Sequence, residues 1–153
     1  MAAARYQIRA TEFIRADEIT AAAHDAIENG MRGALAIVVA DAKRSVARGP
    51  KTGRIYHRRG ITHQASAPGE PPATDTGVLV NSIAGDIETS ERQNGFVRAY
   101  IRASAAYAGF LELGTRHMAA RPFLVPAIER NRAAIQKFMS ETVRTGIGRF
   151  MAR

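Results

Sequence analysis

The feature that most constrains the fold is a long apolar repeat in the first third of the sequence. From about Ala16 onward, apolar residues recur at spacings of three and four, which places them on one face of a helix. The repeat comprises Ile19, Ala23, Ile27, Met31, Leu35, Val38, Ala42 and Val46. Acidic residues lie in its first turn and cations in its last turn, as suits the helix dipole. Gly49-Pro50 is expected to end the helix. The pattern predicts one long helix over 16–48, in which Gly30 and Gly33 mark a bend or a close helix contact.

A second apolar stripe predicts another helix near the C-terminus. After Arg121-Pro122, apolar residues recur at helical spacing from about Phe123 or Pro126 towards Thr145. The stripe consists of Leu124, Ile128, Ile135, Phe138, Met139, Thr142 and Val143. The last residues, "GIGRFMAR" over 146–153, are predicted to form a frayed basic tail.

Two other segments have the alternation of β-strands. Residues 5–13 alternate weakly between apolar and polar side chains and predict a short edge strand. Residues at about 85–103 are typical of a β-hairpin, with Asn94-Gly95 as its turn.

Two short helices are predicted on either side of that hairpin. Residues 74–84 begin with three possible capping side chains, Thr74, Asp75 and Thr76, followed by apolar residues. Residues 104–113 carry small and apolar side chains on one face and end at Gly114, which suits a helix C-cap. The sequence thus predicts an α+β fold in a single domain over 1–153, with two long helices packed against a small antiparallel sheet.

The longest stretch without periodicity, residues 49–75, is rich in proline and glycine. No acidic residue occurs between Asp41 and Glu70, whereas cations are frequent there. We predict a mobile basic loop that gains order from a partner, because alone it buries too little apolar surface to offset its conformational entropy. Its candidate binding cations are Lys51, Arg54, Arg58 and Arg59.

The overall charge indicates an anionic partner. A net charge of +8 and an isoelectric point near 10.8 suggest work beside nucleic acid or an acidic protein surface. The absence of cysteine excludes disulfides, cysteine-ligated zinc and a thiol nucleophile. The longest apolar run, at 33–40, is too short to cross a bilayer, and no apolar secretory segment precedes the first charges. We expect a soluble, intracellular protein with no membrane partner.

Sequence motifs that carry catalysis are absent. The chain has no GxSxG elbow, Walker-type phosphate loop or HExxH motif. Two of its four histidines, His57 and His63, lie among arginines, whose charge repels a metal ion. Asp86, Glu88 and Glu91 could bind a divalent ion, although a solvated strand face is the simpler explanation. We therefore expect no enzymatic activity, no cofactor and no bound metal.

Two longer motifs give the chain a family resemblance. The stretches "ASAPGEPPATDTGVLVNSI" at 65–83 and "AYAGFLELGTRHMAARPFLVPAI" at 106–128 resemble the tail-completion, or head–tail joining, proteins of long-tailed double-stranded DNA bacteriophages. This family includes the lambda minor tail protein Z and also occurs in prophages and gene transfer agents. Order and spacing agree over about two thirds of the chain. The departure is a long insertion from about Lys51 to Gln64.

The resemblance implies an α+β fold and a structural role in the virion neck. It implies a ring, expected to be a hexamer, that completes the tail and lies between the connector and the tail tube. Expected partners are other copies of the chain, connector proteins, and tail terminator or tail-tube proteins, with DNA passing through the ring as a further contact. Such a protein would assemble in the host cytoplasm. The candidate assembly residues are Thr76, Gly77, Tyr107, Glu112, Gly114, Thr115, Arg121, Pro122 and Phe123.

The second motif is also predicted to form a corner between two helices. Gly114 permits a positive φ at the end of the short helix. Pro122 holds Arg121 extended and fixes the entry into the last helix.

Within this corner we predict specific roles for the side chains. Glu112 and Arg121 are expected to pair, either across the corner or between subunits. Phe123 is expected to fill the core, and Thr115 and His117 to be ordinary loop residues.

Two other functional classes remain open from the sequence. The arm from Arg54 to Arg59, with Tyr56 among its cations, could bind nucleic acid without sequence specificity. Asp86 and Glu88 could serve a metal-dependent nuclease.

Overall fold

The computed structural model describes residues 5–8, 21–58, 60–89 and 97–151. Its elements, in chain order, are β1 (Arg5–Ile8), α1 (Ala21–Arg48), β2 (Ile55–Arg58), β3 (Ile61–Gln64), α2 (Val78–Ser82), β4 (Ile83–Thr89), β5 (Val97–Ala103), α3 (Ala108–Leu113) and α4 (Leu124–Met151).

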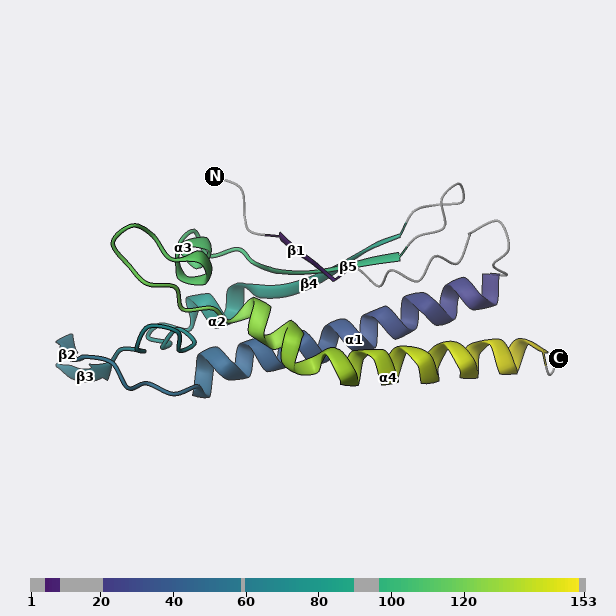
Figure 1. The fold of residues 1–153 in the computed structure, drawn as a ribbon, viewed down its shortest axis with the longest axis horizontal. Helices are drawn as coiled ribbons and strands as arrows, with labels where there is room; N and C mark the ends of the chain where they lie inside the picture. The colour runs from purple at the N-terminus through teal and green to yellow at the C-terminus, as the bar shows by residue number, and fades with distance from the viewer. Residues whose placement is uncertain (1–4, 9–20, 59, 90–96, 152–153) are drawn as a thin grey trace.

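The fold is α+β, as the sequence predicts, because the two long helices pack with a small antiparallel sheet. In the described part of the chain the sheet has the strand order β1-β5-β4, and it lies along α1 (Figure 1). Helix α4 runs alongside α1 in the opposite direction and makes most of its contacts with it. Strands β2 and β3 form a separate hairpin at one end of the molecule.

The core lies between α1, the sheet and the first turn of α4. The face of α1 predicted from the apolar repeat is confirmed from Met31 onward, where Met31, Leu35, Val38, Ala42 and Val46 are buried. Alternation on β5 buries Ala99, Ile101 and Ala103, in agreement with the predicted strand. Phe123 directly precedes α4, and its side chain is fully buried, which confirms its predicted place in the core.

Helices α1 and α4 approach closely at the two predicted glycines. A Cβ atom on Gly33 would lie only 2.2 Å from Cε1 of Phe138, and one on Gly30 would lie 2.9 Å from Sδ of Met139. Side chains from α4 therefore occupy the space that a larger residue on α1 would fill. Of the two alternatives offered by the sequence, the close helix contact is the one observed.

The β-strands agree with the prediction where they are described. Strand β1 is an edge strand paired antiparallel to β5, with Tyr6 opposite Ile101. Strands β4 and β5 pair antiparallel along their whole lengths, from Ile83–Ala103 to Thr89–Val97. The predicted turn at Asn94-Gly95, residues 9–13 of the predicted edge strand and residues 16–20 of the predicted first helix lie outside the described residues.

Three predicted helix boundaries are wrong. Helix α3 begins at Ala108, whereas residue 104 was expected to start it. Helix α4 continues to Met151, whereas a frayed tail was expected from Gly146. A glycine costs a helix about 1 kcal/mol, which is too little to end a helix that is already nucleated. Helix α2 begins after Gly77, which has a left-handed conformation and makes no side-chain cap, so none of the three predicted caps is used.

Candidate assembly surface

The buried carboxylate of Glu112 organises the corner between α3 and α4. Its Oε2 atom accepts hydrogen bonds from the backbone N–H groups of Phe123, at 2.8 Å, and Leu124, at 3.1 Å. Its Oε1 atom accepts one from the N–H of Val125, at 2.9 Å. The side chain is 4% exposed. Glu112 therefore caps the N-terminus of α4 from a different helix.

The cap matches a need of α4. The first N–H groups of a helix have no intrahelical acceptor, and the helix dipole favours a negative charge at this end. Helix α4 has no acidic residue in its own first turn. Glu112 supplies both the acceptor atoms and the charge.

The predicted pair of Glu112 with Arg121 across the corner is wrong. In the described structure, the guanidinium of Arg121 instead donates from Nε and Nη2 to the carbonyl oxygen of Ser66, at 3.3 and 3.2 Å. The backbone N–H of Arg121 donates to the carbonyl of Leu111, at 2.7 Å. The sequence does not predict that Glu112 accepts hydrogen bonds from backbone groups, because no side chain at 123–125 marks these residues as its partners.

Arg121 belongs to a contact that joins the two sequence motifs. Arg121 bonds to the carbonyl of Ser66, which is buried. The carbonyl of the neighbouring Ala120 accepts a hydrogen bond from the N–H of Gly69, at 3.0 Å. Segments 66–69 and 120–121, which lie more than fifty residues apart, are thus held together by backbone and side-chain bonds. This motif junction fixes the base of the basic loop to the corner.

Gly114 allows the corner to turn. Its φ of 74° and ψ of −178° fall in a region that is essentially restricted to glycine. A Cβ atom there would also lie 2.9 Å from the Met118 carbonyl oxygen and the Ala120 nitrogen. The positive φ is as predicted. Thr115 pairs with Met118 through two backbone hydrogen bonds, so it shapes the loop, and His117 is exposed within it.

The basic loop contains a hairpin that the sequence does not predict. Strands β2 and β3 pair antiparallel from Ile55–Gln64 to Arg58–Ile61, and the ladder continues through Gly53 and Ala65 at its base. We call residues 53–65 the arm. It was missed because its strands have only four residues each and no apolar face, and nearly all their side chains are exposed.

One face of the arm is tied to the segment before α2. Arg58 forms an ion pair with Asp75, with 2.8 Å between Nη1 and Oδ2, and His63 lies 3.5 Å from the same carboxylate. The rings of Tyr56 and His63 stack with their centroids 5.5 Å apart. One face of the Tyr56 ring is therefore already covered by His63.

The entry to the arm is held by a carboxylate. Glu70 accepts hydrogen bonds from the hydroxyl and N–H of Thr52 and from the N–H of Ala67. The Thr52 hydroxyl makes the largest contribution, and the two backbone N–H groups add to it, so that the pKa of Glu70 lies below its usual value of 4.5. Of the predicted binding cations, Lys51 and Arg54 form no ion pair among the described residues, and Arg59 lies outside them.

An exposed apolar ridge covers the outer side of α3. Tyr107, Phe110 and Leu113 follow one another at intervals of three residues and are 43%, 49% and 71% exposed. The opposite side of α3 carries the buried residues Ala108 and Glu112. We call these three residues the α3 ridge. Of its members, only Tyr107 was among the predicted assembly residues, although the spacing of three could have identified all of them.

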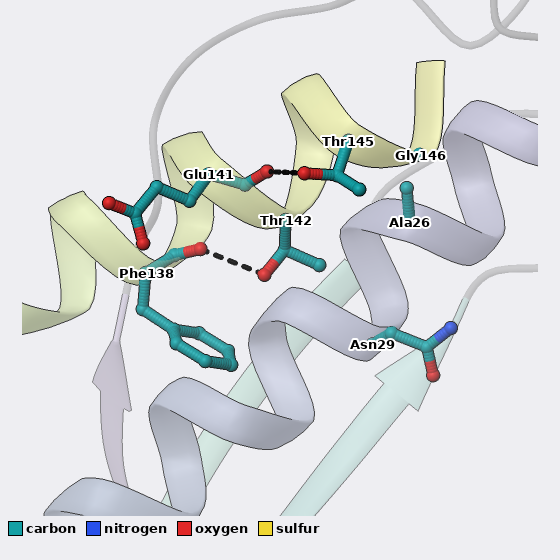
Figure 2. Close-up of a pocket in the computed structure, with 7 residues that line it drawn as sticks. All are labelled: Ala26, Asn29, Phe138, Glu141, Thr142, Thr145 and Gly146. Carbon is teal, nitrogen blue, oxygen red and sulfur yellow. Dashed lines mark hydrogen bonds between the residues drawn. The ribbon is translucent and has the colours of Figure 1, made fainter. Parts of the chain in front are cut away.

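A groove lies between the N-terminal half of α1 and the C-terminal half of α4 (Figure 2). Its volume is about 380 Å³. Phe138 and Ala26 give it an apolar part, and Asn29, Glu141, Thr142 and Thr145 contribute polar groups. We call this the helix groove. The sequence does not predict the helix groove. Phe138 was assigned to the apolar stripe of the last helix, whereas its side chain is 37% exposed.

Of the remaining candidate residues, Pro122 lies in the corner between α3 and α4, and the others lie elsewhere. Thr76 is exposed before α2, and Pro122 is half-buried beside Phe123. On β4, Asp86 pairs with Arg102 and Glu88 accepts a hydrogen bond from Tyr100. Within the described ranges no group of three or more His, Asp or Glu side chains could hold a metal ion, and none of the helices has the length and apolar character of a membrane span.

No protein-family model, no curated protein and no solved structure matched this chain.

Proposed function

We propose that this chain is a structural component of a phage-type virion neck that completes the tail and joins it to the DNA-filled head. The observation that carries the proposal is the motif junction. The two motifs that resemble tail-completion proteins meet there, through Arg121 on Ser66 and Gly69 on Ala120. A functional unit made of both motifs requires such a contact.

The exposed features of the molecule suit assembly rather than catalysis. The α3 ridge presents three large apolar side chains, and the arm presents Ile55 and Ile61, which are 59% and 61% exposed. Apolar side chains that gather on a surface mark sites of protein contact. In this proposal other copies of the chain cover part of this surface in a ring, and connector and tail proteins cover the rest.

A genetic experiment tests the role in the virion. Deleting the gene from the source phage, prophage or gene transfer agent should leave filled heads and complete tail tubes unjoined, as seen by electron microscopy. The wild-type gene supplied in trans should restore joined particles. Normal numbers of joined, DNA-delivering particles without the gene would refute the proposal.

Nucleic-acid binding by the arm is a second candidate. Lys51 and Arg54 favour it, since neither is neutralised by an ion pair in the described structure and the sequence from 42 to 69 holds no acid. Two observations weigh against it: Tyr56 is stacked on His63, and the charge of Arg58 is compensated by Asp75. A base would have to displace these contacts.

Salt-dependent titration separates the two candidates. If the arm binds DNA, affinity should fall steeply with salt, and Lys51→Ala with Arg54→Ala should lower the slope of log K against log salt by about 1.8. If the chain is a neck protein whose arm meets protein, both substitutions should leave the weak DNA affinity and its slope nearly unchanged.

A further inference from the structure

The arm and the helix groove lie at opposite ends of the molecule. Figure 1, with the longest axis horizontal, shows β2 and β3 at one end and the C-terminal part of α4 beside the start of α1 at the other. The groove is lined by these distal parts of the helices, from Ala26 on α1 and from 138–146 on α4. An arm that projects from one end and a groove at the other can meet only between two molecules.

The arm lacks the support that a hairpin of its size needs. Two-stranded hairpins are marginally stable in water unless a face packs on other structure. All four side chains of β2 and three of the four on β3 are exposed, and among the described residues only Arg58 and His63 tie one face to other structure, at Asp75. At the tip, Ile61 follows the turn and is 61% exposed. This aliphatic side chain gains nothing from a phosphate backbone, but it gains from an apolar pocket.

The helix groove offers such a pocket. Figure 2 shows the ring of Phe138 directed towards α1, with Thr142 next along α4 and Ala26 on the facing helix. The groove is open to solvent and its volume of about 380 Å³ is ample for one isoleucine side chain. An occupant would cover Phe138, which is otherwise one of the large exposed apolar residues.

Charge favours the same pairing. The arm and its flanks carry cations and no acid between residues 42 and 69. The groove carries Glu141 at its rim, and Asp25 is exposed beside Ala26. Lys137 and Arg144 flank Glu141 on α4 but form no ion pair with it in the described structure. Its carboxylate is therefore open to a cation such as Arg54 from another molecule.

These observations lead to one contact. We propose that the arm of one copy docks into the helix groove of the next, with Ile61 against Phe138 and arm cations beside Glu141. Such a contact joins two different surfaces and is therefore heterologous; it gives a ring when the rotation between copies closes and an open filament when it does not. The inference rests on the proposed function, which requires a ring, and it names the surfaces that form that ring.

Crosslinking tests the contact because the chain contains no cysteine. The double variant Ile61→Cys/Asn29→Cys places one thiol on the arm and one at the groove, too far apart to react within one molecule. A short bis-maleimide should convert it into a ladder of multimers on a denaturing gel. Two matched controls keep Ile61→Cys and move the second thiol: Ser140→Cys lies on α4 outside the groove, and Leu113→Cys lies on the α3 ridge. Neither control should form a ladder.

Each outcome decides a different claim. A ladder specific to Asn29→Cys supports the arm–groove contact, and a ladder that stops at two chains supports the contact while contradicting the ring. Ladder formation through Leu113→Cys, or dimers from Ile61→Cys alone, would overturn the contact. So would the lack of any ladder; if light scattering then shows a ring, the proposed function stands without this interface.

A substitution gives an independent measurement on the uncrosslinked protein. Ile61→Asp should raise the dissociation constant between copies about tenfold or more, because a charge replaces a buried aliphatic group. Thr62→Asp, its exposed neighbour on the opposite face of the arm, is the matched control and should change it less than about threefold. Equal effects of the two substitutions, with unchanged circular dichroism, would overturn the proposal.

Discussion

Replacing Glu112 should strongly destabilise the corner between α3 and α4. Glu112→Ala removes the acceptor for three backbone N–H groups, and those of Phe123 and Leu124 belong to buried residues. A hydrogen bond to a charged group contributes about 1.5–3 kcal/mol, and a buried donor left without a partner costs about 1–3 kcal/mol. The negative charge at the N-terminus of α4 adds about 0.3–2 kcal/mol.

These contributions do not add in full, because the N–H of Val125 belongs to a half-buried residue that water can reach. We expect Glu112→Ala to lower the free energy of unfolding by about 3–5 kcal/mol. That is a large share of the roughly 5–15 kcal/mol that stabilises a typical domain. At about 2–4 °C per kcal/mol for a chain of this size, Tm should fall by roughly 6–20 °C.

Urea unfolding followed by circular dichroism measures the loss. Glu112→Gln keeps one oxygen acceptor without the charge and should cost less, about 1–3 kcal/mol. Glu129→Ala is the matched control, since Glu129 is an exposed carboxylate on α4, the helix that Glu112 caps, and should change stability by less than about 0.5 kcal/mol. If the free energy of unfolding of the Glu112→Ala variant lies within about 1 kcal/mol of the wild-type value, the carboxylate cap does not hold the corner.

Three further changes test the corner and the base of the arm. Gly114→Ala should lower the free energy of unfolding by about 1–3 kcal/mol, because its backbone conformation disfavours any side chain; an unchanged urea midpoint would refute this. Arg121→Ala should speed amide exchange in segment 66–69 at least tenfold while α1 stays protected, since the guanidinium bonds to the Ser66 carbonyl are lost; equal exchange would show that the junction does not depend on Arg121. Thr52→Val should raise the pKa of Glu70 towards 4.5 in an NMR titration, because the Thr52 hydroxyl is the main cause of its lowered pKa. Since the folded pKa is lowered, the Glu70 contribution is present above about pH 4.5 and is lost as the pH falls through the folded pKa, so the two proteins should differ in stability at neutral pH and converge in acid.

The spacing of apolar residues predicted the long helices and strands, because an element that buries one face needs apolar side chains at regular intervals. The repeat ending at Val46 predicted α1, and alternation around Ile101 predicted β5. Gly33 was correctly flagged, since a glycine inside a helix usually has a packing reason. Fold class and core therefore followed from local patterns.

The features that shape the candidate surface depend on contacts that local patterns do not encode. Glu112 bonds to backbone groups, and every residue except proline offers an N–H, so nothing in the sequence marks Phe123 as its partner. The arm consists of two four-residue strands that pack on no apolar face, and the end of α4 was placed too early because Gly146 resembles a helix stop. In each case tertiary context decided between local alternatives.

The proposed function depends most directly on whether several copies of this chain assemble into a closed ring. Light scattering coupled to size exclusion measures its mass directly, over protein concentrations from about 1 to 100 μM. If the proposal is right, the protein forms a single multimeric species of several copies, which electron microscopy shows as a closed ring. A monomer at every concentration that binds DNA with a steep dependence on salt would contradict the account and favour the nucleic-acid-binding alternative.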